Sequence, residues 1–274
     1  MQKTLFSIAA LLFFGLMIQS CKKDKQISDA EKMTAEDLLA HNDLSEQLDY
    51  DASEVIDNFT GGDLEDRGDC PAVTFAQPKG TWPNTITLDY SDAGCTNNGH
   101  TYQGKVIINQ TNEMKVPGAV RNFTFDHFSI EGVKMEGART VTFTGLNTVG
   151  QPSFSIAVDE TFTFPSGAQA THVANRTRTL TEGFGTITPL DNVWTIEGTA
   201  SGVNRNGDAY TVTITKALVK KNPCTWIGEG TIEFTVNGQT RSLDFGDGSC
   251  DREATLTLAD GTVKDVKIKH FWWK

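Results

Sequence analysis

The chain has 274 residues and a formal net charge of −11, with 22% of its residues charged. This acidic balance argues against nucleic acid as a partner and against binding to anionic lipid by charge. The length is sufficient to bury a sizeable core, as one large β-domain or two smaller ones.

Residues 1–20 have the layout of a secretory signal. The basic residue Lys3 precedes an apolar run from Leu5 to Ile18, and the small residue Ser20 stands before Cys21. The apolar run is shorter than the roughly 18 residues that a membrane-spanning helix needs. We therefore predict that residues 1–20 are a signal peptide.

The segment Ile18-Gln19-Ser20-Cys21 resembles the lipobox of bacterial lipoproteins. The resemblance implies that Cys21 becomes the mature N-terminus and carries acyl chains such as palmitate. Two or more chains anchor a protein stably, at about 0.8 kcal/mol per buried methylene. The alternatives are an ordinary cleaved signal or a short anchor that is never cleaved. By analogy with lipoprotein sorting in Gram-negative bacteria, we expect the outer membrane, on its periplasmic or surface face.

Residues 21–33 are charged and polar, which predicts a tether between the membrane and the fold. Thr34, followed three positions later by Asp37, resembles a helix capping box. We predict a short helical segment over residues 34–62 that packs beside the β-domain or spaces it from the membrane. Its apolar residues form a broken face: Leu38, Leu39, Leu44, Leu48, Val55, Ile56 and Phe59.

Residues 63–274 are predicted to form an antiparallel β-domain, because apolar and polar residues alternate between frequent turn residues. The dipeptides Asn206-Gly207, Asn237-Gly238 and Asp260-Gly261 are typical of hairpin turns. No βαβ alternation is present, so the expected fold class is all-β: mainly an antiparallel meander, closed as a sandwich or barrel-like sheet of twelve or more strands. The predicted strands include 85–90, 102–108, 122–130, 140–143, 160–164, 193–197, 210–215, 230–236, 254–258 and 263–271.

Residues 88–95 are echoed by residues 243–250, with four of eight positions identical. Apart from Cys21, four cysteines remain, and an even number in an oxidising compartment suggests two disulfides. Each echoed segment ends in a cysteine that follows another at nearly the same spacing, which predicts the pairs Cys70–Cys95 and Cys224–Cys250. The echo also suggests two related β-units, about 70–160 and 190–274, at opposite ends of one sheet.

The echoed turns contain carboxylates that could contribute to a calcium site. Calcium takes six to eight oxygen ligands, but the EF-hand spacing is not met here. Asp is also frequent in turns because it bonds its own backbone. We therefore predict plain turns and no metal or cofactor, and retain four aspartates as weak calcium candidates: Asp89, Asp92, Asp244 and Asp247.

The sequence contains no G-x-S-x-G elbow, H-E-x-x-H helix, P-loop or dinucleotide fingerprint. A glycosidase needs two carboxylates that flank one glycosidic bond. Asp159 and Glu160 are a candidate pair, but adjacent residues of a strand point to opposite faces of the sheet. We predict no catalytic residues and no enzymatic activity. The five histidines occur singly along the chain: His41, His100, His127, His172 and His270.

Tryptophan offers a further interpretation, because exposed rings can stack on sugars whereas buried rings fill a core. The five are Trp82, Trp194, Trp226, Trp272 and Trp273. In Trp272-Trp273, which ends the last predicted strand, one ring should be exposed.

The start Cys21-Lys22-Lys23-Asp24, the cysteine-bounded hairpins and the turn at 243–250 together resemble uncharacterised β-rich lipoproteins of Bacteroidota. That family implies a location and a fold but no activity. We predict a membrane-anchored envelope lipoprotein that binds a glycan, lipid or protein partner without catalysis. A structural or assembly role in the outer membrane is the alternative, and an unrecognised hydrolase is less favoured.

Overall fold

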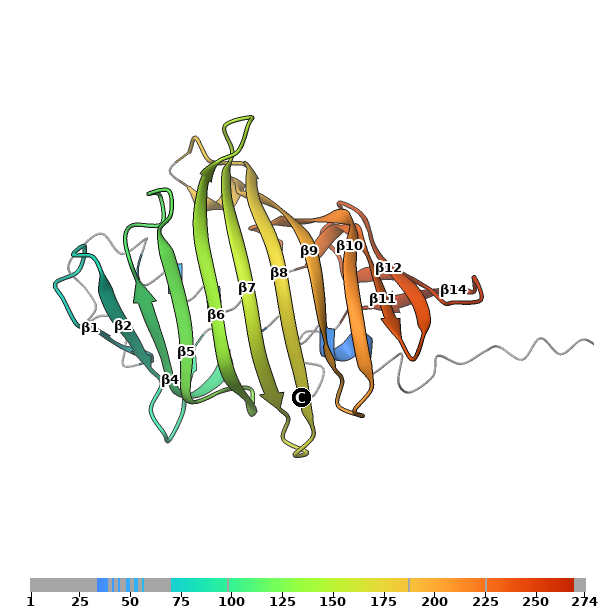
Figure 1. Ribbon diagram of the computed structural model, residues 1–274, viewed down its shortest axis with the longest axis horizontal. Helices are drawn as coiled ribbons and strands as arrows, with labels where there is room; N and C mark the ends of the chain where they lie inside the picture. The colour runs from blue at the N-terminus through green and yellow to red at the C-terminus, as the bar shows by residue number, and fades with distance from the viewer. Residues whose placement is uncertain are drawn as a thin grey trace, which may run out of the picture.

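One continuous antiparallel sheet forms the body of the protein (Figure 1). The computed structural model describes residues 34–38, 41, 44, 48–49, 52–53, 56, 70–97, 99–186, 188–224 and 226–268. The 14-stranded sheet has the order β1-β2-β4-β5-β6-β7-β8-β9-β10-β11-β12-β13-β14, with β3 paired to β4. The predicted meander is therefore confirmed, and β1 and β14 form the edges of the sheet in the described chain.

The strands are β1 (Ala72–Phe75), β2 (Asn84–Asp89), β3 (Cys95–Asn97), β4 (His100–Gln110), β5 (Val120–Ile130), β6 (Val133–Leu146), β7 (Pro152–Thr163), β8 (Gln169–Glu182), β9 (Val193–Val203), β10 (Ala209–Lys221), β11 (Ile227–Val236), β12 (Gln239–Asp247), β13 (Glu253–Thr257) and β14 (Val263–Lys267). A short 3₁₀ helix, η1 (Pro189–Asp191), lies between β8 and β9.

The sheet has an inner face, which carries the core, and an outer face of mostly polar residues. Side chains alternate between them, so that every second residue of β7 from Ile156 to Phe162 is buried. The inner face supplies large buried side chains from most strands, including Ile86, Phe123, Phe162 and Phe234. Burial of this continuous apolar surface is the main stabilising contribution to the fold.

The described residues between 34 and 56, here called the helical segment, are helical and pack on the inner face. Their buried apolar members are Leu38, Leu44, Leu48, Ala52 and Ile56. At one end, the Thr34 hydroxyl accepts a hydrogen bond from Asn204 in the β9–β10 turn (2.9 Å). At the other, the Ser53 hydroxyl accepts one from Arg121 on β5 (3.4 Å). The segment therefore crosses the sheet from β10 to β5.

A bulge in β5 explains why Phe128 joins Phe123 in the core although their spacing breaks strict alternation. His127 there has a φ of 50°, and its backbone lies against Gly104 on β4. A Cβ at Gly104 would lie 2.3 Å from the His127 carbonyl oxygen, so only glycine fits. The bulge leaves the His127 side chain 83% exposed, as expected for a strand-face residue.

The three predicted Asn-Gly and Asp-Gly turns are confirmed between β9 and β10, β11 and β12, and β13 and β14. Gly207, Gly238 and Gly261 all have positive φ, as such turns require. Four strands had no predicted range: β1, β3, β8 and β12.

Candidate functional site

The predicted anchor residue, Cys21, and the predicted tether lie outside the described residues. So do His270, Trp272 and Trp273. Within the part of the chain that the structure describes, no helix is long and apolar enough to cross a membrane.

The two predicted disulfides are present, Cys70–Cys95 and Cys224–Cys250. The first joins the start of β1 to the residue that follows the turn after β2, and the second spans the β11–β12 hairpin in the same way. These hairpins lie near opposite ends of the one sheet. Neither bridge uses Cys21, the remaining one of the five cysteines in the sequence.

The sequence echo corresponds to a shared local geometry. Asp89 accepts a hydrogen bond from the Ser91 amide (2.9 Å), and Asp244 accepts one from the Gly246 amide (2.9 Å). Ser91 and Gly246 both have positive φ, 60° and 98°. Each copy therefore has the same Asp-stabilised backbone turn, which follows β2 in the first copy and lies within β12, at its register shift against β11, in the second.

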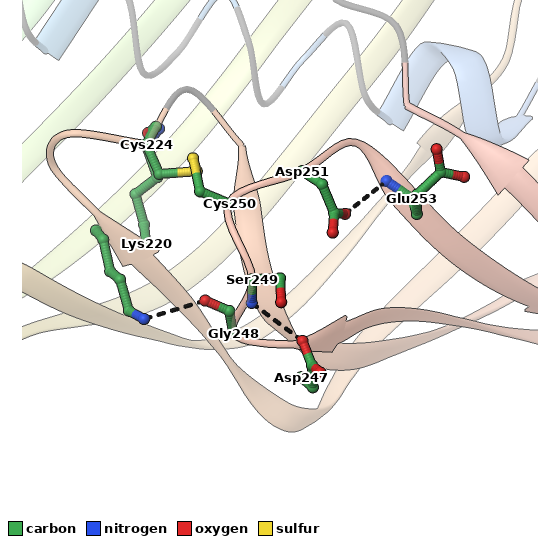
Figure 2. The surroundings of a disulfide bond; sticks show 9 residues. Lys220, Cys224, Asp247, Gly248, Ser249, Cys250, Asp251 and Glu253 are labelled. Atoms are coloured by element: carbon green, nitrogen blue, oxygen red, sulfur yellow. Dashed lines mark hydrogen bonds between the residues drawn. A yellow bond between two sulfur atoms is a disulfide. The ribbon is translucent and has the colours of Figure 1, made fainter.

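The four calcium candidates lie at these turns, where the contacts are with protein groups. Asp89 forms an ion pair with Lys105 (2.8 Å), and the hydrogen bond from the Lys105 ammonium, followed by that from the Ser91 amide, lowers the pKa of Asp89. Asp244 also accepts from the Thr231 hydroxyl (2.8 Å). Figure 2 shows Asp247 accepting from the Ser249 amide beside the second disulfide. Asp92 is exposed.

No group of three His, Cys, Asp or Glu residues is placed to hold a metal ion among the residues described. The geometry therefore gives the calcium interpretation no support, whereas the turn interpretation accounts for the carboxylate contacts of three candidates.

A layer of charged and polar side chains lies between the helical segment and the inner face. At its first end, Asp37 accepts from both the backbone amide (2.9 Å) and the Nε (2.5 Å) of Arg205. Arg205 also pairs with Glu36 (3.0 Å). Burial raises the pKa of Asp37 to about 6, although the hydrogen bonds from Arg205 act in the opposite direction.

At its second end, Asp49 of the helical segment bridges two arginines of the sheet. Its carboxylate lies 3.1 Å from Arg178 on β8 and 3.5 Å from Arg139 on β6. All three side chains are largely buried. A charge in such surroundings is tolerated only when it is paired, so this bridge fixes the position of the segment.

Between these ends, His172 on β8 is held by a directed hydrogen-bond network. The Tyr210 hydroxyl donates to the Thr171 carbonyl (3.0 Å), so its oxygen accepts from His172 Nδ1 (2.8 Å). Arg176 can only donate, so His172 Nε2 accepts from it (3.3 Å). Because a protonated Nε2 could not accept from Arg176, the contacts require the neutral imidazole with its proton on Nδ1. Burial lowers the pKa of His172 well below its usual value.

Tyr210 reaches His172 by crossing β9 over Gly202. A Cβ at Gly202 would lie 2.7 Å from the Tyr210 hydroxyl and 1.9 Å from the Thr171 carbonyl oxygen. The missing side chain therefore creates the space that this network occupies.

His41 and Glu160 are the least satisfied groups of this layer. The His41 ring stacks on His172 with centroids 4.4 Å apart and meets the edge of Phe162. Within the described structure, neither ring nitrogen of His41 nor either carboxylate oxygen of Glu160 has a hydrogen-bond partner. Burial lowers the pKa of His41 to about 3 and raises that of Glu160 to about 7.

This layer attaches the helical segment to the sheet. Its acids and histidines are covered on one side by the segment and on the other by the strands, so it gives the hydrolase alternative no support. Asp159 lies on the opposite face from Glu160, as predicted, and is exposed. The sequence interpretation missed the pairing of His41 with His172. The sequence holds one indication that His41 is buried: it continues the helical spacing of Leu38, Leu44 and Leu48.

The described tryptophans are half-buried. The Trp194 indole donates to Asn222 (3.1 Å), and the Arg178 guanidinium lies 4.8 Å from the centre of its ring. One face of Trp194 is therefore covered by a cation, which leaves that face unable to stack on a sugar.

Exposed apolar side chains occur at three connections between strands, which lie at one end of the sheet, the upper end in Figure 1. We call them the apolar loop surface: Val116 (38% exposed), Leu146 (65%), Val149 (73%), Phe184 (51%) and Leu190 (67%). Leu146 is the last residue of β6, and the others belong to the β4–β5, β6–β7 and β8–β9 connections. Exposed apolar clusters on soluble domains commonly mark interaction sites.

No family model, curated protein or solved structure matches this chain.

Proposed function

We propose that this protein is an envelope lipoprotein, anchored through acylated Cys21, whose β-domain binds a partner without catalysis. Two observations support the anchor. Both disulfides form without Cys21, and Cys21 directly follows a signal-like apolar run. A lipid-modified N-terminus accounts for this fifth cysteine in an oxidising compartment.

Binding rather than catalysis is supported by where the exposed and buried groups lie. Arg139, Arg178 and Arg205 are engaged with acids of the helical segment, whereas apolar side chains at three connections are open to solvent. A surface of this kind suits association better than a reaction.

The test compares the wild type with Cys21→Ala in the native host. The wild type should incorporate radiolabelled palmitate and fractionate with membranes, and the variant should do neither. A matched Cys224→Ser/Cys250→Ser variant, which removes a bridge but keeps Cys21, should retain the label. A Cys21→Ala protein that is still acylated would overturn the proposal.

A further inference from the structure

We propose that the apolar loop surface is the binding site for another envelope protein that meets it through an uncharged, apolar surface, on the side facing away from the anchoring membrane. This inference rests on the proposed function, because it uses the position of the acylated N-terminus.

The loops that carry the apolar loop surface are poor in charge, and the β6–β7 loop has a fixed conformation. Residues 146–151 and 183–190 contain no charged residue, in a chain that is 22% charged. The charged residues of the three connections are Glu113 and Lys115, which pair with each other (2.6 Å), and Asp191, which accepts a hydrogen bond from Thr186 (2.9 Å). The Asn147 side chain accepts from the amides of Val149 (3.1 Å) and Gln151 (2.9 Å), which fixes the first loop. Pre-ordered apolar side chains bind with less loss of conformational entropy than mobile ones.

Hydrogen bonds connect these loops to one another through the ends of the strands. The Gly118 amide donates to the Phe143 carbonyl (2.8 Å), which ties the β4–β5 loop to β6. The Gln151 side chain donates to the Thr181 carbonyl (3.2 Å), which ties the β6–β7 loop to the end of β8. The side chains thus project from a shared platform, and their exposure suits a broad partner surface rather than an enclosed small molecule.

The predicted tether joins the fold at the end of the sheet opposite the apolar loop surface. Thr34 bonds the β9–β10 turn, which lies at the opposite end of the strands, the lower end in Figure 1. Residues 21–33 can span at most about 45 Å when fully extended. β8, with 14 residues, is itself about 45 Å long at roughly 3.3 Å per residue.

The apolar loop surface could therefore reach the anchoring membrane only if the whole tether were stretched along the body, which chain entropy opposes. A partner located away from that membrane is favoured, and the predominance of exposed apolar side chains on this surface favours an apolar protein surface. Exposed aromatic side chains such as Phe184 are enriched in the core of protein interfaces.

The test places a photo-reactive benzophenone amino acid at Val149 or Phe184 of the full-length protein in its native cells. The control position is Ser166, which is exposed in the β7–β8 turn at the opposite end. We expect one envelope protein to be crosslinked from both loop positions and not from Ser166. Phe184→Ser should lower the yield at position 149 at least fivefold, whereas Val263→Ser, which removes an exposed apolar side chain at the other end, should leave it unchanged.

The crosslinked protein, once purified, should bind the wild type at least tenfold more tightly than Val149→Ser/Phe184→Ser, with equal melting temperatures of the two proteins. Adducts only with lipid, only with a second copy of this chain, or no more than at Ser166 would each overturn the inference. Acylation of Cys21 is measured in the same cells. If Cys21 is acylated but no partner is crosslinked, the inference about the apolar loop surface fails while the proposed anchor stands.

Discussion

The imidazole of His41 on the helical segment stacks on that of His172 on β8, with ring centroids 4.4 Å apart. His172 is satisfied by Tyr210 and Arg176, whereas His41 has no hydrogen-bond partner in the described structure. The pair therefore joins the segment to the sheet by packing that depends on both rings being neutral.

His41→Phe should flatten the loss of stability in acid. The folded-state pKa of His41, about 3, lies below its ordinary 6.5, so the unfolded chain binds the proton first. Stability is then fully present above pH 6.5 and falls as the pH drops towards 3. Between pH 7.5 and 5 the wild type should lose about 2 kcal/mol more than the variant in urea unfolding. His127→Asn, at an exposed position, should behave like the wild type; an unchanged pH profile for His41→Phe would contradict the burial of His41.

Glu160→Gln should stabilise the protein in alkali. Burial raises the pKa of Glu160 from 4.5 to about 7, so stability is lost as the pH rises through this range and the loss is complete above pH 7. At pH 8 the variant should gain roughly 1–3 kcal/mol, and at pH 4 it should gain nothing. Asp159→Asn, the neighbouring exposed acid, serves as the control. Destabilisation of Glu160→Gln at pH 8 would show that the carboxylate is favourably bound.

Asp49→Asn should be strongly destabilising, because it leaves Arg139 and Arg178 without their shared carboxylate. Removing one partner of a buried ion pair costs about 3–5 kcal/mol. The exposed pair Lys134–Glu136 gives the control, and Glu136→Gln should change stability by less than about 1 kcal/mol. Equal effects of the two substitutions in chemical denaturation would argue against a helical segment held by Asp49.

Removing the second disulfide by Cys224→Ser/Cys250→Ser should lower stability by about 3 kcal/mol. The same loss is expected for Cys70→Ser/Cys95→Ser, because the two closed loops differ by one residue. Peptide mapping under non-reducing conditions should recover only these two pairs. A crossed pair, such as Cys70 with Cys224, would contradict the structure.

The sequence interpretation succeeded where local chemistry decides the structure and failed where distant residues do. Turns such as Asn206-Gly207 were predictable because positive φ demands particular residues. β8 was missed because its inward residues include Ala170, His172 and Arg176 rather than large apolar side chains. These residues face the polar layer, which forms only when the helical segment packs on the sheet.

The helical segment shows the same limit. Its apolar face looked broken because Asp37, His41 and Asp49 interrupt the leucines, yet all three are buried. Their partners, Arg205, His172 and Arg178, lie more than a hundred residues away, so the sequence alone could not show that the interruptions complete the interface. The apolar loop surface was also not predicted, because exposure of a loop residue depends on the whole fold.

The most direct test of the central claim is the intact mass of the mature protein extracted from the membranes of its native host. We predict a chain that begins at Cys21. Its mass should exceed that of the unmodified chain by a diacylglycerol group, alone or with one further acyl chain. A membrane-retained protein that begins at another residue, or that carries no lipid on Cys21, would contradict it.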